Sequence, residues 1–140
     1  MPRPLWERWK RKVKPSIKSV ILCSVQRAAC VMRKKRVAVF ISGEGTNLQA
    51  LIDASRMEDY PAQITLVVSN VEGAGGIKRA EDADIATLVV NHKDYETRGQ
   101  FEAVIETMLE EEDIELICLA GFMRILSDHF VKVWDGKILN

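Results

Sequence analysis

Short apolar runs of strand type alternate with helical patterns from residue 36 onward, and this alternation restricts the chain to few architectures. The runs lie at residues 36–41, 63–69, 85–90 and 114–120. Nearly every position in them is apolar, which is typical of strands buried on both faces of a parallel sheet. Strands that alternate with helices predict an α/β fold, in which helices flank the parallel sheet.

Two capping boxes indicate where helices begin between these strands. Thr46 is followed three residues later by Gln49, and Thr97 by Gln100, so that a hydroxyl and a carboxamide can pair with the first backbone N–H groups of a helix. The second helix has a continuous apolar face, with apolar residues at i, i+3, i+4, i+7 and i+8. This face consists of Phe101, Val104, Ile105, Met108 and Leu109.

Shorter elements complete the predicted pattern. Residues 77–84 suit a short helix between the second and third strands. Ser127 can cap a further helix that runs through residue 134, and Gly136 suits its end. Residues 137–140 are expected to be extended.

Charge divides the chain into two parts. Residues 1–35 contain eleven Lys or Arg and one acidic residue, a net charge of +10, whereas residues 36–140 have a net charge of −10. We therefore expect a basic extension over residues 1–35, disordered or helical, and a folded domain over residues 36–140.

The basic extension has several possible roles. Its Arg-rich, acid-poor composition and helical apolar spacing after Pro15 fit a mitochondrial transit peptide, which is the alternative to a cytoplasmic protein with a simple extension. Basic residues also attract nucleic acid, but no nucleic-acid-binding motif accompanies them, so no such partner is expected. No run approaches the roughly 18 apolar residues of a membrane helix, so no membrane association is expected.

A metal site is not expected. The three cysteines, Cys23, Cys30 and Cys118, have no CxxC spacing and only two histidines to accompany them. Those histidines, His92 and His129, have no evident partner in the sequence, and a structural or surface role is the simplest interpretation of both.

The loop at residues 42–47 is the first candidate ligand site. In open α/β sheets, ligands bind at the carboxyl ends of the strands, where this loop lies. Gly45 allows close approach of the backbone, the following helix N-terminus attracts phosphate, and Thr46 and Asn47 add side-chain donors. Glu44 would repel an anion if it pointed inward. A strand–helix turn without a ligand fits the local sequence equally well.

Residues 119–126 are the second candidate, because an apolar loop follows a buried strand where a polar one is expected. Met123, Ile125 and Leu126 surround Arg124. Such a loop could form a pocket for a flat heteroaromatic ligand. A small core beneath the loop is the alternative interpretation.

Two isolated residues are further candidates. Arg98 is badly placed for the dipole of its helix and could instead pair with a carboxylate or phosphate, although a solvated surface position is commoner. Asn140 would lie at the carboxyl end of a strand, where its amide could donate to a developing oxyanion.

Taken in order, these segments resemble phosphoribosylglycinamide (glycinamide ribonucleotide) formyltransferases. The resemblance rests on RVAVFISGEGTNLQALID, VVSN, NHKDYETR, CLAGFMRILS and WDGKILN, and covers residues 36–140. Within that family, the sequence is most similar to the form that animals have as part of a trifunctional purine-synthesis protein. The implied fold is the Rossmann-like formyltransferase fold, here in part.

The resemblance implies transfer of a formyl group from 10-formyltetrahydrofolate to glycinamide ribonucleotide in de novo purine (IMP) synthesis, without a metal. It implies that Gly45, Thr46 and Asn47 bind the ribonucleotide phosphate. Folate-binding positions would be Arg98, Met123, Arg124, Ile125, Leu126 and Asn140. Asn140 would also be catalytic, as the donor to the oxyanion.

The resemblance also implies residues that this sequence does not contain. The family's catalytic His lies two residues beyond the Asn that matches Asn140, and its Asp partner lies further on. We therefore expect a partial, C-terminally truncated domain that is inactive by itself. The alternative hypothesis is a non-catalytic nucleotide-binding or interaction module derived from this fold.

Overall fold

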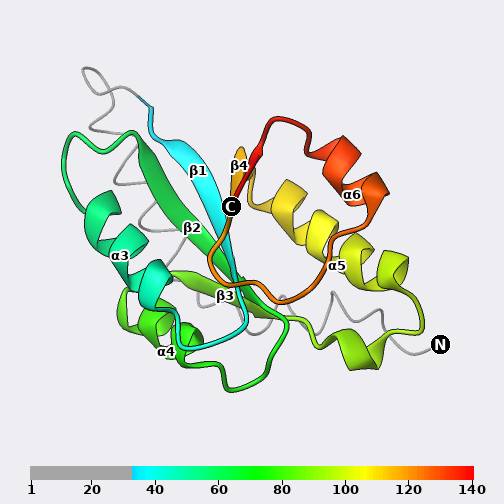
Figure 1. The fold of residues 1–140 in the computed structure, drawn as a ribbon. Coiled ribbons are helices and arrows are strands. Elements are labelled where there is room, and N and C mark those ends of the chain that lie inside the picture. Colours follow the sequence, from blue (N-terminus) through cyan, green and yellow to red (C-terminus); the bar gives the residue numbers. More distant parts are fainter. Residues whose placement is uncertain (1–32) are drawn as a thin grey trace. The chain divides into compact units, whose positions relative to one another are not determined.

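A computed structural model describes residues 33–140, which form a parallel sheet with helices on both faces (Figure 1). The strand order is β3-β2-β1-β4-β5, and every neighbouring pair is parallel. The strands are β1 (Lys35–Ile41), β2 (Ala62–Ser69), β3 (Ala86–Val89), β4 (Leu116–Leu119) and β5 (Ile138–Leu139). The predicted α/β fold is confirmed, although β4 is shorter than the apolar run that predicted it.

The helices cover the sheet in two pairs. Helices α3 (Thr46–Ser55) and α4 (Gly75–Asp82) lie on one face, and α5 (Arg98–Glu111) and α6 (Asp128–Val133) on the other (Figure 1). A 3-10 turn, η1 (His92–Asp94), precedes α5. Both faces of the sheet are therefore buried, which explains why its strands are apolar at nearly every position.

Alternate side chains of β1 belong to the two layers of core. Val37, Val39 and Ile41 pack in one cluster with Leu48 and Ile52 of α3. On the other face, the ring of Phe40 lies 5.3 Å from that of Phe122 and 6.3 Å from that of Phe130, between centroids. This division follows from the two-residue period of a strand.

The capping predictions were right for α5 and α6. Thr97 Oγ1 accepts a hydrogen bond from Gln100 N–H at 3.2 Å, and Ser127 Oγ accepts one from Phe130 N–H, also at 3.2 Å. The Gln100 side chain reaches back to Glu96 N–H rather than to Thr97, so the reciprocal half of the box is displaced by one residue.

The capping box predicted for α3 was wrong. The N-cap is Gly45, in the left-handed region with φ 74°, and no side chain caps this helix. Thr46 is its first helical residue, and Gln49 donates to Asp53 Oδ1 at 3.0 Å. The first N–H groups of α3 are therefore left without a side-chain cap.

The expected basic extension lies almost wholly outside the described residues. A compact unit begins at Lys34. Within the part of the chain that the structure describes, no helix combines the length and apolarity that a membrane span requires.

Candidate functional site

The order of the strands reverses at β1. From this strand the chain first builds outward through β2 and β3, then crosses to the other side to form β4 and β5. At such a reversal the loops after the two central strands separate, and the crevice outside their carboxyl ends is the usual ligand site of open α/β sheets. The loops in question are those that follow β1 and β4, the same two that the sequence analysis singled out.

Gly45 brings the N-termini of α3 and α4 together. A Cβ on Gly45 would lie 2.6 Å from the Cα of Gly76, and a Cβ on Gly76 would lie 2.4 Å from Ile41 Cδ1. Gly76 N–H donates to the carbonyl of Gly43 at 3.1 Å. Because neither helix has a side-chain cap, two uncapped helix N-termini meet at one glycine loop. Such N–H groups favour an anion.

Arg79 of α4 fixes the backbone of this loop. Its Nε donates to the carbonyl of Glu44 at 2.8 Å, and its Nη1 lies 3.5 Å from Gln49 Oε1. The carboxylate of Glu44 lies over Gly75, since a Cβ there would be 2.6 Å from Glu44 Oε2. The charge of Glu44 is therefore next to the first turn of α4, where the helix dipole favours it.

Ser42 connects the ends of three strands. Its hydroxyl donates to Asn70 Oδ1 at 2.5 Å and accepts from Met123 N–H at 2.8 Å. Ser42 follows β1, Asn70 follows β2, and Met123 lies in the loop after β4. This network brings the glycine loop and the apolar loop to adjacent positions.

The apolar loop exposes most of its large side chains. Met123 and Ile125 are each 79% exposed, and Arg124 is also exposed, whereas Leu126 is half-buried. Phe122 alone packs edge-on against the core, on Phe40. The alternative of a small core beneath the loop is therefore wrong for Met123 and Ile125.

The remaining predicted residues lie at the same edge of the sheet or near it. Cys118 pairs with Leu139, so Asn140 follows β5 at the carboxyl edge, beside the start of the apolar loop. Arg98 is the first residue of α5 and is exposed. Thr46 and Asn47 are exposed in the first turn of α3. The binding roles of these residues remain predictions.

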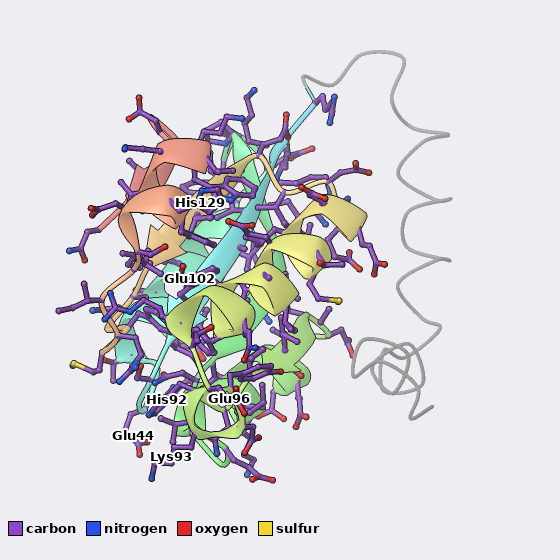
Figure 2. All side chains as sticks on the ribbon, turned by 90° about the vertical axis from the view of Figure 1, so that its right-hand side faces the viewer. Glu44, His92, Lys93, Glu96, Glu102 and His129 are labelled. Atoms are coloured by element: carbon purple, nitrogen blue, oxygen red, sulfur yellow. The ribbon has the colours of Figure 1, made fainter. Side chains whose placement is uncertain are left out.

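The two histidines lie apart. Figure 2 shows His92, Glu44, Lys93 and Glu96 toward one end of the domain and His129 toward the other. His92 is half-buried, and its Nδ1 has no hydrogen-bond partner among the described residues. His129 is exposed on α6.

Cys118 is half-buried on β4, next to the site. Burial raises the pKa of its thiol above the ordinary value of 9.0. The thiol is therefore protonated at neutral pH, and a thiolate nucleophile is not available at this position. Within residues 33–140, no group of three or more His, Cys, Asp or Glu side chains is placed to bind a metal ion.

Sequence reasoning missed three residues that organise the site. Ser42 was part of the predicted loop without a role, Arg79 was unmarked, and Glu102 lies on the apolar face of α5, where it is only 3% exposed. Val104, which was predicted on that face, is only half-buried. The signal that could have identified Glu102 is its position next to Phe101, at the edge of the predicted apolar face.

The geometry first defines a class: a Rossmann-like α/β domain with a ligand site at the reversal of its strand order. Residues 35–140 match the family described as formyl transferase, so the chain belongs to that family. This confirms the resemblance inferred from the sequence.

Relatives with assigned names agree with this family. The chain is 55% identical over 107 residues to a trifunctional purine biosynthetic protein adenosine-3 of Gallus gallus. The aligned region covers 76% of this chain and 11% of that protein. It is 42% identical over 106 residues to a phosphoribosylglycinamide formyltransferase of Haemophilus influenzae. This alignment covers 76% of this chain and 50% of that protein. The chain thus spans about half the length of this bacterial relative.

Solved structures give the same result. A phosphoribosylglycinamide formyltransferase from Brucella melitensis matches with a TM-score of 0.74 and 42% identity, over 76% of this chain and 55% of the other. A glycinamide ribonucleotide transformylase 1 from Geobacillus kaustophilus matches with a TM-score of 0.73 and 40% identity, over 76% of this chain and 56% of the other.

Proposed function

We propose that this chain provides the ribonucleotide and folate sites of a phosphoribosylglycinamide formyltransferase. The reaction transfers a formyl group from 10-formyltetrahydrofolate to the amino group of glycinamide ribonucleotide, a step of purine (IMP) synthesis. The network around Ser42 carries the proposal, because it connects the glycine loop to the exposed apolar loop at the reversal of the strand order.

The glycine loop would bind the ribonucleotide phosphate. Gly45 has no Cβ and therefore packs directly against Gly76, and the first N–H groups of α3 lack a side-chain cap. These groups and the positive end of the helix dipole stabilise negative charge. The exposed side chains of Thr46 and Asn47 can add hydrogen bonds to the phosphate.

The apolar loop would bind the folate. Met123 and Ile125 present apolar surface that the protein itself does not cover, which suits a flat pterin ring. Backbone groups of residues 123–126 can then satisfy the polar edge of that ring. Arg98 and Arg124 are exposed cations able to pair with the carboxylates of the folate.

Asn140 would stabilise the charge that develops during the reaction. When the amine attacks the formyl group, negative charge develops on the formyl oxygen, and the Asn140 side-chain amide can donate to it. The proton transfers also need an acid/base, which the resemblance assigns to a His two residues after this Asn. His92 cannot serve, because it follows β3, four strand spacings or about 19 Å from β5.

A binding experiment on the 140-residue chain tests the proposal. Calorimetric titration with glycinamide ribonucleotide and, separately, with tetrahydrofolate should give one site for each ligand. Excess inorganic phosphate should compete with the ribonucleotide and leave folate binding unchanged. A chain that binds neither ligand contradicts the proposal, and one that binds the ribonucleotide alone supports a nucleotide-binding module instead.

We also propose a cytoplasmic location, with mitochondrial import directed by residues 1–35 as the alternative. The alternative is supported by the eleven basic residues and single acidic residue of that segment. Imaging of residues 1–35 fused to a fluorescent protein separates the two.

A further inference from the structure

Glu102 is an acidic side chain on the buried face of α5. It is 3% exposed and lies one residue after Phe101, which is also buried. A buried carboxylate is unfavourable unless hydrogen bonds satisfy its oxygens. The described residues give Glu102 no ion pair, so its hydrogen bonds must provide this compensation.

Both hydrogen bonds of Glu102 come from Ser127. Glu102 Oε1 accepts from Ser127 N–H at 2.7 Å, and Glu102 Oε2 accepts from Ser127 Oγ. Ser127 Oγ also accepts from Phe130 N–H and thereby caps α6. Glu102 is thus joined through one serine to the start of the helix that buries Phe130.

Ser127 ends the apolar loop of residues 121–126, which Glu102 therefore fixes at its downstream end. Upstream, Ser42 accepts from Met123 N–H at 2.8 Å. Between these two connections, Met123 and Ile125 are each 79% exposed and gain little order from their own burial. Besides the packing of Phe122 on Phe40, the conformation of the loop therefore depends on the hydrogen bonds at its two ends.

We propose that Glu102 is a positioning residue, which keeps the 121–126 loop in the conformation that receives the folate co-substrate without contacting that ligand. This inference rests on the proposed function for the identity of the ligand. Its chemical basis is that Ser127 offers two donors, its N–H and its hydroxyl, and each oxygen of the Glu102 side chain accepts one of them. A carboxamide of the same shape provides only one acceptor, so Glu102→Gln should loosen the loop.

Hydrogen exchange of the ligand-free 140-residue chain tests the positioning. In E102Q, the amides of residues 121–127 should exchange at least about tenfold faster, as expected for loss of one buried hydrogen bond. Residues 46–55 should change less than about twofold. The matched control is Glu110→Gln, an exposed glutamate on the same helix, which should change neither segment. Equal acceleration in both segments, or none, would overturn the proposal.

A second variant covers the case in which E102Q does not fold. Ser127→Ala keeps the N–H bond to Glu102 and removes the hydroxyl, which breaks the second bond to Glu102 and also removes the cap of α6. It should produce the same local increase in exchange over residues 121–126. Unchanged exchange there would also overturn the proposal.

Ligand affinity separates this inference from the proposed function. E102Q should weaken tetrahydrofolate binding about tenfold and leave glycinamide ribonucleotide binding within about twofold. Equal weakening of both ligands would mean a general loss of structure and would overturn the positioning role. If the parent chain binds no tetrahydrofolate, the proposed function is wrong, and the exchange experiment still decides whether Glu102 fixes the loop.

Discussion

Ser42 Oγ accepts a 2.8 Å hydrogen bond from the backbone N–H of Met123, 81 residues further along the chain. The same hydroxyl donates to Asn70 Oδ1, at the end of β2. One serine thus connects the loops that follow β2 and β4, the strands on either side of β1. The glycine loop and the apolar loop follow the paired strands β1 and β4, and this hydroxyl connects the two loops directly.

Replacement of Ser42 by Ala should remove both hydrogen bonds. Asn70 is 4% exposed, so its Oδ1 would lose its donor in a buried environment. We expect a loss of about 1–2 kcal/mol of unfolding free energy, measured in urea. Ser55→Ala is the control, because that hydroxyl bonds only within its own helix, to Ile52 O. An equal loss in the two variants would contradict the role assigned to Ser42.

Gly45→Ala should eliminate ribonucleotide binding. The residue has φ 74°, and an added Cβ would lie 2.6 Å from the backbone of Gly76, which cannot move aside as a side chain could. The loop must therefore shift and misdirect the N–H groups of α3. Gly43→Ala is the matched control, since nothing lies within 4 Å of a Cβ there. Calorimetry should find ribonucleotide affinity lost in the first variant and kept in the second.

Phe101→Ala tests the packing of α5. Phe101 is 4% exposed, and its ring lies 6.1 Å from that of Tyr95 in an edge-on arrangement. Removing a buried ring of this size should cost about 3–5 kcal/mol. Val133→Ala, at a residue that is 52% exposed, should cost under about 0.5 kcal/mol. A loss under about 1 kcal/mol for Phe101→Ala in urea unfolding would contradict the described packing.

Structural features that depend on residues close in sequence could be predicted, whereas those that were missed depend on contacts with residues far along the chain. The caps at Thr97 and Ser127 involve residues three positions away, and both were predicted correctly. The cap of α3 was not, because Gly45 adopts its positive φ where it packs against Gly76, far along the chain. A local pattern contains no information on that contact.

The same reasoning explains the candidate site. The loops after β1 and β4 could be selected from sequence, because ligand sites lie at carboxyl ends of strands. Their connection through Ser42 could not, because it requires β4 to lie beside β1, and alternation of strands and helices does not specify strand order. Glu102 was missed because its partner, Ser127, is 25 residues away.

Glu112 should make stability depend on pH. Burial raises the pKa of its carboxyl above the ordinary value of 4.5, and the opposing attraction of Arg36, whose Nη2 is 3.5 Å away, is smaller. The folded state therefore binds the proton more tightly than the unfolded state, so the contribution of Glu112 to stability falls as pH rises above that ordinary value. Arg36 stays bound through its Nε, which donates to the carbonyl of Glu112 at 2.7 Å.

Glu112→Gln should remove this dependence. Relative to the parent, the variant should gain stability between pH 4 and pH 7, as measured by urea unfolding at each pH. Glu110→Gln changes an exposed position on the same helix, and the stability of this variant should depend on pH in the same way as that of the parent. A variant that loses stability relative to the parent as pH rises would show that the ion pair with Arg36 outweighs burial.

The 140-residue chain should bind ligands and yet show no formyltransferase turnover. The attacking amine must lose a proton and the folate nitrogen must gain one, and a positioned acid/base contributes about 10²–10⁴-fold to such transfers. His92 is about 19 Å from β5 by the spacing of the strands, and His129 is exposed on α6, so neither is placed beside Asn140. Asn140 alone would supply a single oxyanion donor, worth about 10²–10³-fold. The formation of folate product, followed by absorbance, should stay at background while the full-length Haemophilus influenzae relative turns over. A rate within tenfold of that relative would show that the acid/base lies within residues 1–140.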